Sequence, residues 1–356
     1  MPTSSPERAS QSKITVETCS ASASNDWDTF VSAHPSATNY HRWGWKDVIE
    51  RAFGWSSFYL MARRGGQVCG TLPIVWQKSF LFGSFMTSMP FLNGGGVLAQ
   101  IPEAALALTH EAIAIASGNQ VKYLELRHRQ PQPELGLATR SHKVRVIRAV
   151  EPDADSMFRS FDPKLRADIR KAMKWNLQSE VGGPELLPDF YQIFTENMRD
   201  LGTPPYSRRF FEEIYRAFPD TTYITIVRHD GTPVASSFLI GFGDTVEAGW
   251  SSSRRKYLPM KPNMALYWQN LRLAGERGYT LFDFGRSTVG SGTHRFKMQW
   301  GGREESLHWD YWVPEGGSPP ALNPNNPKYE LMIRMWKKLP VGLTRLIGPA
   351  IVKSLP

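Results

Sequence analysis

The stretch 280–302 concentrates ionisable side chains whose types and spacing suit group-transfer chemistry. Cations can stabilise a developing oxyanion or hold a substrate phosphate, and a carboxylate can orient a cation or an amine. Taken singly, each of these residues is better explained as a cap or a solvated surface charge, but their density together with the glycines favours a binding site. Within fifteen residues stand one carboxylate, two arginines, one histidine and one lysine: Asp283, Arg286, His294, Arg295 and Lys297.

A short strand is predicted to present the first of these charges. Apolar residues on both sides of Asp283 indicate a strand that ends at Gly285, with Asp283 on the face opposite to Phe282 and Phe284. The mostly small and polar residues of 287–293 then form a loop that a ligand can approach closely. Because ligand sites in α/β sheets form at strand ends, this position is the predicted site.

An internal repeat indicates how the rest of the chain supports this strand. The segment 58–74 resembles 222–240 as strand, turn and strand, and the segment 110–127 resembles 268–286 as helix, turn and strand. The repeat predicts an α/β fold with mixed sheets, built from two similar domains. The predicted divisions are a disordered tail (1–13), a first domain (14–150), a second domain with the main site (151–314), and a Pro/Gly linker with a basic amphipathic tail (315–356).

The bulk properties exclude several classes of function. The net charge of +9 fits an anionic partner such as a nucleic acid, a nucleotide-linked substrate or an acidic membrane. The two cysteines, Cys19 and Cys69, show no metal or disulfide spacing, and the chain has neither an HExxH nor a GxSxG motif. No apolar run is long enough to cross a bilayer. We therefore expect a cytoplasmic protein without a metal site.

The pattern DFGRS, followed by a glycine loop and GTHRFKMQWGG, resembles the Fem family of peptide-bond-forming transferases. It is most similar to the branch associated with exosortase and exopolysaccharide loci in Gram-negative bacteria. The resemblance implies two tandem domains of the acyl-CoA N-acyltransferase (GNAT-like) fold. It also implies transfer of an aminoacyl or acyl group to an amine of a cell-envelope or exopolysaccharide precursor. Lys297 matches the lysine of the family's Phe-Lys pair.

Direct acyl transfer needs aligned substrates, stabilisation of an oxyanion and removal of a proton from the amine. We expect Lys297, Asp283 and Arg286 to be the catalytic residues. No bound cofactor is expected, because the acyl donor is itself a co-substrate, either aminoacyl-tRNA or acyl-CoA. The alternatives are an acyl-CoA-dependent N-acetyltransferase and a catalytically silent GNAT-like module that binds anionic glycan or lipid carriers.

The donor's phosphates are expected to meet side chains in the segment 253–262, SRRKYLPMKP. An acyl-CoA enzyme of this fold would have a glycine-rich loop there, whereas Pro259 and Pro262 remove backbone donors. This argues against CoA and leaves room for RNA-borne phosphate. The predicted substrate-binding residues are Arg254, Tyr257, Lys261, Tyr206, Arg295 and Lys46.

The tail from Lys328 onward combines apolar spacing with six cations and one acid. Such a segment can pack back on the first domain or lie in the surface of an anionic membrane. The second alternative would make the protein peripheral on the inner membrane.

Overall fold

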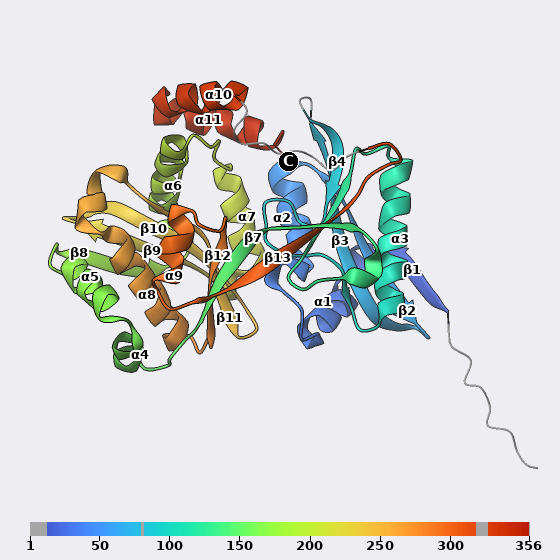
Figure 1. The fold of residues 1–356 in the computed structure, drawn as a ribbon, viewed down its shortest axis with the longest axis horizontal. Helices are drawn as coiled ribbons and strands as arrows, with labels where there is room; N and C mark the ends of the chain where they lie inside the picture. Colours follow the sequence, from blue (N-terminus) through green and yellow to red (C-terminus); the bar gives the residue numbers. More distant parts are fainter. Residues whose placement is uncertain (1–12, 80–81, 318–326, 356) are drawn as a thin grey trace, which may run out of the picture.

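The structure, a computed structural model, describes residues 13–79, 82–317 and 327–355. Residues 1–12 of the predicted disordered tail and residues 318–326 of the predicted linker lie outside this range. The described chain forms two α/β halves that stand side by side, with a pair of C-terminal helices along one edge (Figure 1).

The first half is an antiparallel meander that ends in one parallel strand pair. The helix α3 covers one face of its sheet, and α1 and α2 pack on the other side. The residues of α3 begin with Pro102 at the first helical position, where the missing backbone donor costs nothing. The elements of this half are β1 (Ile14–Thr18), α1 (Ser24–Ala33), α2 (Gly44–Phe53), β2 (Ser56–Arg64), β3 (Gln67–Ser79), β4 (Gly83–Thr87), β5 (Leu98–Ala99), α3 (Pro102–Gly118), β6 (Leu124–His128) and β7 (Ala138–Ala149).

The second half repeats this plan. Here α8 and α5 cover one face of the sheet, and α6 packs on the other, beside α7. The elements are α4 (Ala154–Ser160), α5 (Pro163–Met173), β8 (Leu177–Gly182), α6 (Leu187–Leu201), α7 (Arg208–Ala217), β9 (Thr222–His229), β10 (Thr232–Phe242), β11 (Thr245–Ser253), α8 (Pro262–Glu276), β12 (Leu281–Ser287), α9 (Gly292–Met298) and β13 (Arg303–Trp312).

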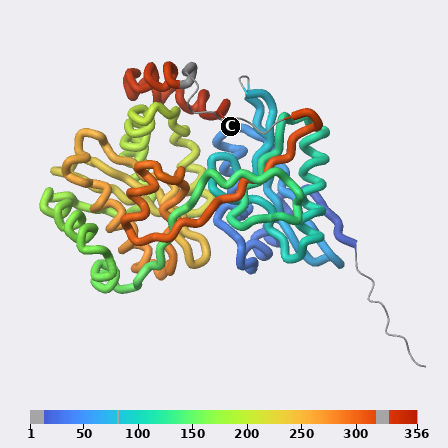
Figure 2. The backbone as a smooth tube through the Cα atoms, viewed as in Figure 1, coloured from blue at the N-terminus to red at the C-terminus, as the bar shows by residue number. Residues whose placement is uncertain are grey.

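The two halves exchange their last strands. β7 leaves the first half and pairs with β12 of the second, whereas β13 leaves the second half and pairs with β6 of the first. β7 and β13 also pair with each other, so they cross the middle of the molecule together (Figures 1 and 2). One continuous sheet results, in the order β1-β2-β3-β4-β6-β13-β7-β12-β11-β10-β9-β8. This exchange was not predicted from the sequence.

A shared hydrophobic core joins the halves. Helix α2 of the first half packs against α7 of the second. Trp45 and Phe53 bring the first half into the same buried cluster as Phe210, Phe211 and Phe238 of the second. Aromatic side chains of this size bury enough apolar surface to fix the relative position of the two halves.

The C-terminal helices α10 (Pro327–Lys338) and α11 (Val341–Val352) lie against α6 of the second half (Figure 1). Of the two alternatives left open for the tail, packing on the first domain is therefore wrong for most of its length. Its end reaches the first half, where the Ser79 hydroxyl donates to the Ser354 carbonyl. No helix of the described chain is both long enough and apolar enough to span a bilayer.

Candidate active site

The site lies where two parallel strands of the second half separate. β11 and β12 pair from Thr245–Leu281 to Glu247–Asp283. On its other edge β12 pairs with β7 from Leu281 to Ser287, and this pairing shifts register between Asp283 and Arg286. The strand runs on to Ser287, so the prediction that Gly285 ends it is wrong. Gly285 instead forms the irregularity: its φ is +74°, and a Cβ there would lie 3.2 Å from the Ala248 carbonyl oxygen. Only glycine fits this conformation without strain.

Lys297 reaches this opening from α9. The Ser291 hydroxyl caps α9 by accepting from the His294 amide, and the buried Trp300 anchors the end of the helix. The ammonium nitrogen Nζ donates to the carbonyl oxygens of Gly285 and Arg286, both at 2.9 Å. Burial lowers the pKa of Lys297 to about 8, with Arg286 acting in the same direction, whereas Asp283 and Glu247 oppose the change.

Asp283 faces the interior between the halves, opposite to Phe282 and Phe284 as predicted. The two rings belong to the core of the second half, whereas the carboxylate, 1% exposed, meets two arginines. Its Oδ2 lies 3.0 Å from Arg145 Nη1 and 3.7 Å from Arg129 Nη2, and its Oδ1 accepts from the Gly285 amide at 2.8 Å. Asp283 thus ties the irregular backbone at Gly285 to the crossing strand β7.

Glu247 places a second buried carboxylate beside the first. Its Oε1 accepts from Asn93 Nδ2 of the first half at 2.8 Å, and its Oε2 lies 3.6 Å from Arg129 Nη2. Burial raises the pKa of Glu247, and the nearby charge of Asp283 raises it further. A Cβ built at Gly285 would lie 3.9 Å from Glu247 Oε1 and 3.8 Å from Lys297 Nζ, so the two charged groups flank the same point.

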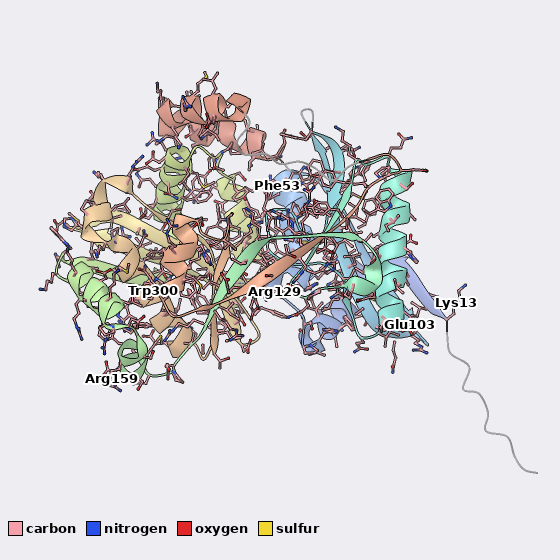
Figure 3. The ribbon with its side chains drawn as sticks, viewed as in Figure 1. Lys13, Phe53, Glu103, Arg129, Arg159 and Trp300 are labelled. Atoms are coloured by element: carbon pink, nitrogen blue, oxygen red, sulfur yellow. The ribbon has the colours of Figure 1, made fainter. Side chains whose placement is uncertain are left out.

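A cavity of about 280 Å³ opens onto this cluster from between the halves. Arg129 stands at the centre of the molecule, near the crossing of β7 and β13 (Figure 3). Two polar atoms of residues that line the cavity, Glu247 Oε2 and Arg129 Nε, are buried without a hydrogen-bond partner. Such atoms are costly to leave unpaired.

Arg286 also lies in the interior between the two halves, next to the cluster of Asp283 and Glu247. Its guanidinium carbon is 5.5 Å from the centroid of the Trp309 ring. Burial lowers the pKa of Arg286, as does the charge of Arg127. Within the described chain, its guanidinium makes no hydrogen bond or ion pair. Tyr206 lies nearby in the shared aromatic core, where burial raises the pKa of its hydroxyl to about 12 against the influence of Arg286.

The structure therefore brings together Lys297, Asp283 and Arg286, with Tyr206 at the edge. The other predicted substrate-binding residues have their contacts elsewhere. Arg254 pairs with Glu196 at 3.1 Å, Lys261 pairs with Asp168, and Tyr257 packs against the core of the second half. Arg295 is exposed on α9 and donates to the Gly290 carbonyl, and Lys46 pairs with Glu50 at 2.5 Å and Ser57 at 2.9 Å in the first half.

Sequence reasoning missed Glu247, Arg129, Arg145 and Asn93. Glu247 had a detectable signal, because it is a single carboxylate inside the otherwise uncharged strand 245–253. Arg129, Arg145 and Asn93 gave no such signal, since only the folded chain brings them to Glu247 and Asp283.

The comparisons with known proteins place this geometry in a fold family. Residues 163–298, from the start of α5 to the end of α9, match the family model described as an acetyltransferase (GNAT) domain. This segment is therefore similar to a GNAT domain. The matched segment includes Glu247, Asp283, Arg286 and Lys297, and the prediction of an acyltransferase enzyme is confirmed at the level of this domain class. No curated protein sequence matches the chain.

Solved structures match the whole architecture at low sequence identity. A crystal structure of FemX superposes with a TM-score of 0.66 at 15% identity, covering 90% of this chain and 100% of that one. A tandem GNAT protein from the clavulanic acid biosynthesis pathway gives 0.54 at 13% identity, covering 86% and 100%. The C-terminal domain of a putative lysylphosphatidylglycerol synthetase from Agrobacterium fabrum gives 0.55 at 11% identity, covering 83% and 92%. The predicted tandem GNAT-like fold is confirmed.

Proposed function

We propose that the protein forms an amide bond by transferring an aminoacyl or acyl group to an amine, in the manner of the Fem family. The observation that carries this proposal is the position of Lys297. Its ammonium is held by two carbonyl oxygens in the opening between β11 and β12, beside the buried carboxylates Glu247 and Asp283. A buried cation fixed in this way can stabilise the oxygen of an acyl group as negative charge develops on it.

Two other residues of the site have distinct roles: Asp283 helps to position Lys297, and Arg286 binds a substrate anion. Asp283 accepts a hydrogen bond from the Gly285 amide and forms an ion pair with Arg145. These two contacts hold the backbone whose carbonyl oxygens accept from Lys297. Arg286, which has no acceptor within the described chain, is available to a substrate anion. These contacts support the proposed roles of Asp283 and Arg286.

The donor is an aminoacyl-tRNA or an acyl-CoA used as a co-substrate, and the acceptor is an amine on a cell-envelope or exopolysaccharide precursor. The Fem-like resemblance of the 280–302 stretch supports the first donor, and its resemblance to the exosortase-associated branch supports this acceptor. An acyl-CoA-dependent N-acyltransferase is the second candidate, favoured by the match of residues 163–298 to the acetyltransferase (GNAT) domain. The proposed location is the cytoplasmic side of the inner membrane.

Titration of the pure protein with CoA and with bulk tRNA separates the two donors. We expect binding of tRNA and transfer from a charged tRNA to an amine acceptor, with loss of transfer in Lys297→Ala. Arg295→Ala is the matched control, because it removes an exposed cation from the same helix. Binding of CoA with transfer from acetyl-CoA would select the second candidate. A protein that binds an anionic carrier but transfers from neither donor would be a silent module, contrary to the proposal.

A further inference from the structure

We propose that the C-terminal helices α10 and α11 form a docking surface for an anionic lipid bilayer. The pair lies along one edge of the molecule, against α6 (Figure 1). Within the described chain every strand of the sheet precedes these helices, so they are added to a sheet that is complete without them. The surface is distinct from the transfer site and takes no part in the reaction.

The inner face of α11 is fixed to the second half. Its buried residues Thr344, Gly348 and Val352 recur every four positions and therefore share one face of the helix. Gly348 permits a close approach, since a Cβ there would lie 2.4 Å from Pro205 Cδ. Helix α11 is thus held in a defined orientation, which fixes the face that it turns outward.

The inner face of α10 is fixed in the same way at the end of α6. Trp336 is buried, and Ile333 packs so closely that a Cβ at Gly202 would lie 2.5 Å from Ile333 Cγ2. Arg199 of α6 donates from Nη1 to the Leu339 carbonyl oxygen at 3.3 Å. Both helices therefore present their remaining faces as part of the folded protein.

The outer faces of both helices are apolar. In α11, Leu343, Leu346 and Ala350 are exposed at intervals of three and four, opposite to the buried face. In α10, Leu331 and Met335 are exposed four residues apart. Of the ten large apolar residues that are exposed in the described chain, six gather on these helices and the adjoining end of α6, each exposed by 41–77%: Leu201, Leu331, Met332, Met335, Leu343 and Leu346. A patch of this kind marks a surface that meets a partner.

Charge identifies the partner as an anionic bilayer. The sequence from residue 327 contains six cations and a single acid, Glu330. Lys338 is exposed and follows Leu331 by seven residues and Met335 by three, so it lies on the same outward face. Apolar residues beside basic residues are typical of helices that lie in a lipid surface, where acyl chains meet the first and phosphates the second. A second copy of this chain would bring the same positive charge and be repelled.

The docked face lies one helix away from the edge of the active site. Helix α11 packs on Pro205, which directly precedes Tyr206 at that edge. An α-helix with its side chains is roughly 10 Å across, so a bilayer on the outer face of α11 lies about that far from this loop. The membrane therefore approaches the site from the Tyr206 side.

Flotation of the full chain with phosphatidylglycerol vesicles and with phosphatidylcholine vesicles tests the proposal, without donor or acceptor. We expect the protein to float with the first and not with the second. Met335→Gln combined with Leu346→Gln should weaken flotation about tenfold or more, because each change removes an apolar side chain from the lipid. Lys338→Gln should weaken it about fivefold, as expected for one cation at an anionic surface. All three side chains are exposed, so these variants should keep the parent's midpoint of thermal unfolding.

The matched control is a second place where exposed apolar residues stand beside cations. Met173 on α5 is 53% exposed beside Lys174, and Leu258 in the short helical segment Arg255–Met260 is 45% exposed beside Lys256. Met173→Gln combined with Leu258→Gln should float as the parent does. Loss of flotation in this pair but not in the Met335 and Leu346 pair would move the docking surface to α5 and overturn the proposal.

Three further results would also overturn it: a parent protein that does not float with phosphatidylglycerol, equal flotation with both lipids, or a dimer that the Met335 and Leu346 variant dissociates. Because no donor or acceptor is present, the outcome is separate from transfer. A protein that transfers normally but does not float would disprove only the docking surface. A protein that floats as expected but transfers nothing would disprove only the proposed function.

Discussion

The two halves contain the same opening between parallel strands and use it differently. In the first half, β4 and β6 are in register at Met86–Leu124, as β11 and β12 are at Thr245–Leu281 in the second. Two residues further along, the first half has Ser88, whose amide donates to the Glu125 carbonyl and whose hydroxyl accepts from the Arg127 amide. The second half has Glu247 beside Asp283.

In the first half the chain itself closes the opening. Arg127 donates to the carbonyl oxygens of Met89 at 3.3 Å and Leu92 at 2.9 Å, and the Val97 amide donates to His128 Nε2 at 2.9 Å. Arg127 is also paired with Glu125 at 2.6 Å. These polar groups are satisfied within the protein, which is the pattern of a structural network.

In the second half the corresponding groups are only partly satisfied. Lys297 has two carbonyl partners but a lowered pKa, and Glu247 Oε2 lies 3.6 Å from Arg129 Nη2 without accepting a hydrogen bond. The buried charges of the first half thus stabilise the fold, whereas those at the corresponding place in the second half remain available to a ligand. Strained and unsatisfied groups of this kind concentrate at functional sites.

The largest expected effect in this comparison is loss of transfer in Lys297→Ala. Removing one oxyanion-stabilising donor costs roughly 10²- to 10³-fold in turnover, or about 3–4 kcal/mol. Lys297→Arg should recover only part of the rate, since a planar guanidinium replaces a point charge. Initial rates of amide formation measure both, and full activity in Lys297→Ala would refute the assignment and favour Arg286.

In the first half, Arg127→Met should instead lower stability. The substitution leaves the buried Glu125 carboxylate without its ion pair, which costs about 3 kcal/mol of unfolding free energy. Urea denaturation measures the loss, and the folded fraction should keep the parent's rate. A stable Arg127→Met protein without activity would show that the first opening also takes part in the reaction.

A smaller effect follows from the lowered pKa of Lys297. Between pH 8 and 10.5 the folded lysine is mostly neutral while the unfolded one still binds its proton, so stability rises with pH in this range. Relative to Lys297→Met, the parent should gain roughly 2–3 kcal/mol from about pH 8 to about pH 10.5. Thermal or urea unfolding across this window checks the sign, and a pH-independent difference would mean that the lysine is not desolvated.

The smallest effect is expected at the irregularity in β12. Gly285→Ala forces a side chain into a left-handed conformation and against the Ala248 carbonyl, which costs about 1–2 kcal/mol. Transfer should also fall, because the Gly285 carbonyl positions Lys297. A variant with unchanged unfolding and unchanged rate would show that this backbone geometry is dispensable.

The sequence was informative wherever the signal was local. The alternation around Asp283 predicted its face correctly, and the repeat together with the Fem-like motif predicted the tandem fold that the structural comparisons confirm. Local patterns failed at boundaries: the strand predicted to end at Gly285 runs on to Ser287, because Gly285 takes up the positive φ and β12 continues to pair with β7 beyond it.

Contacts that depend on the strand exchange could not be predicted. Arg145 reaches Asp283 only because β7 crosses into the second half, and Asn93 reaches Glu247 only because the halves pack together. No periodicity or motif carries such long-range information. The packing of the tail on α6 likewise depends on which apolar surface remains uncovered after both halves have folded.

The most direct test of the central claim is a crystal structure with a stable donor analogue, either an aminoacyl-adenosine amide or a thioether analogue of acetyl-CoA. The account predicts that the carbonyl oxygen of the analogue lies about 3 Å from Lys297 Nζ, between β11 and β12. An analogue bound instead at the first opening, beside Ser88, would contradict it.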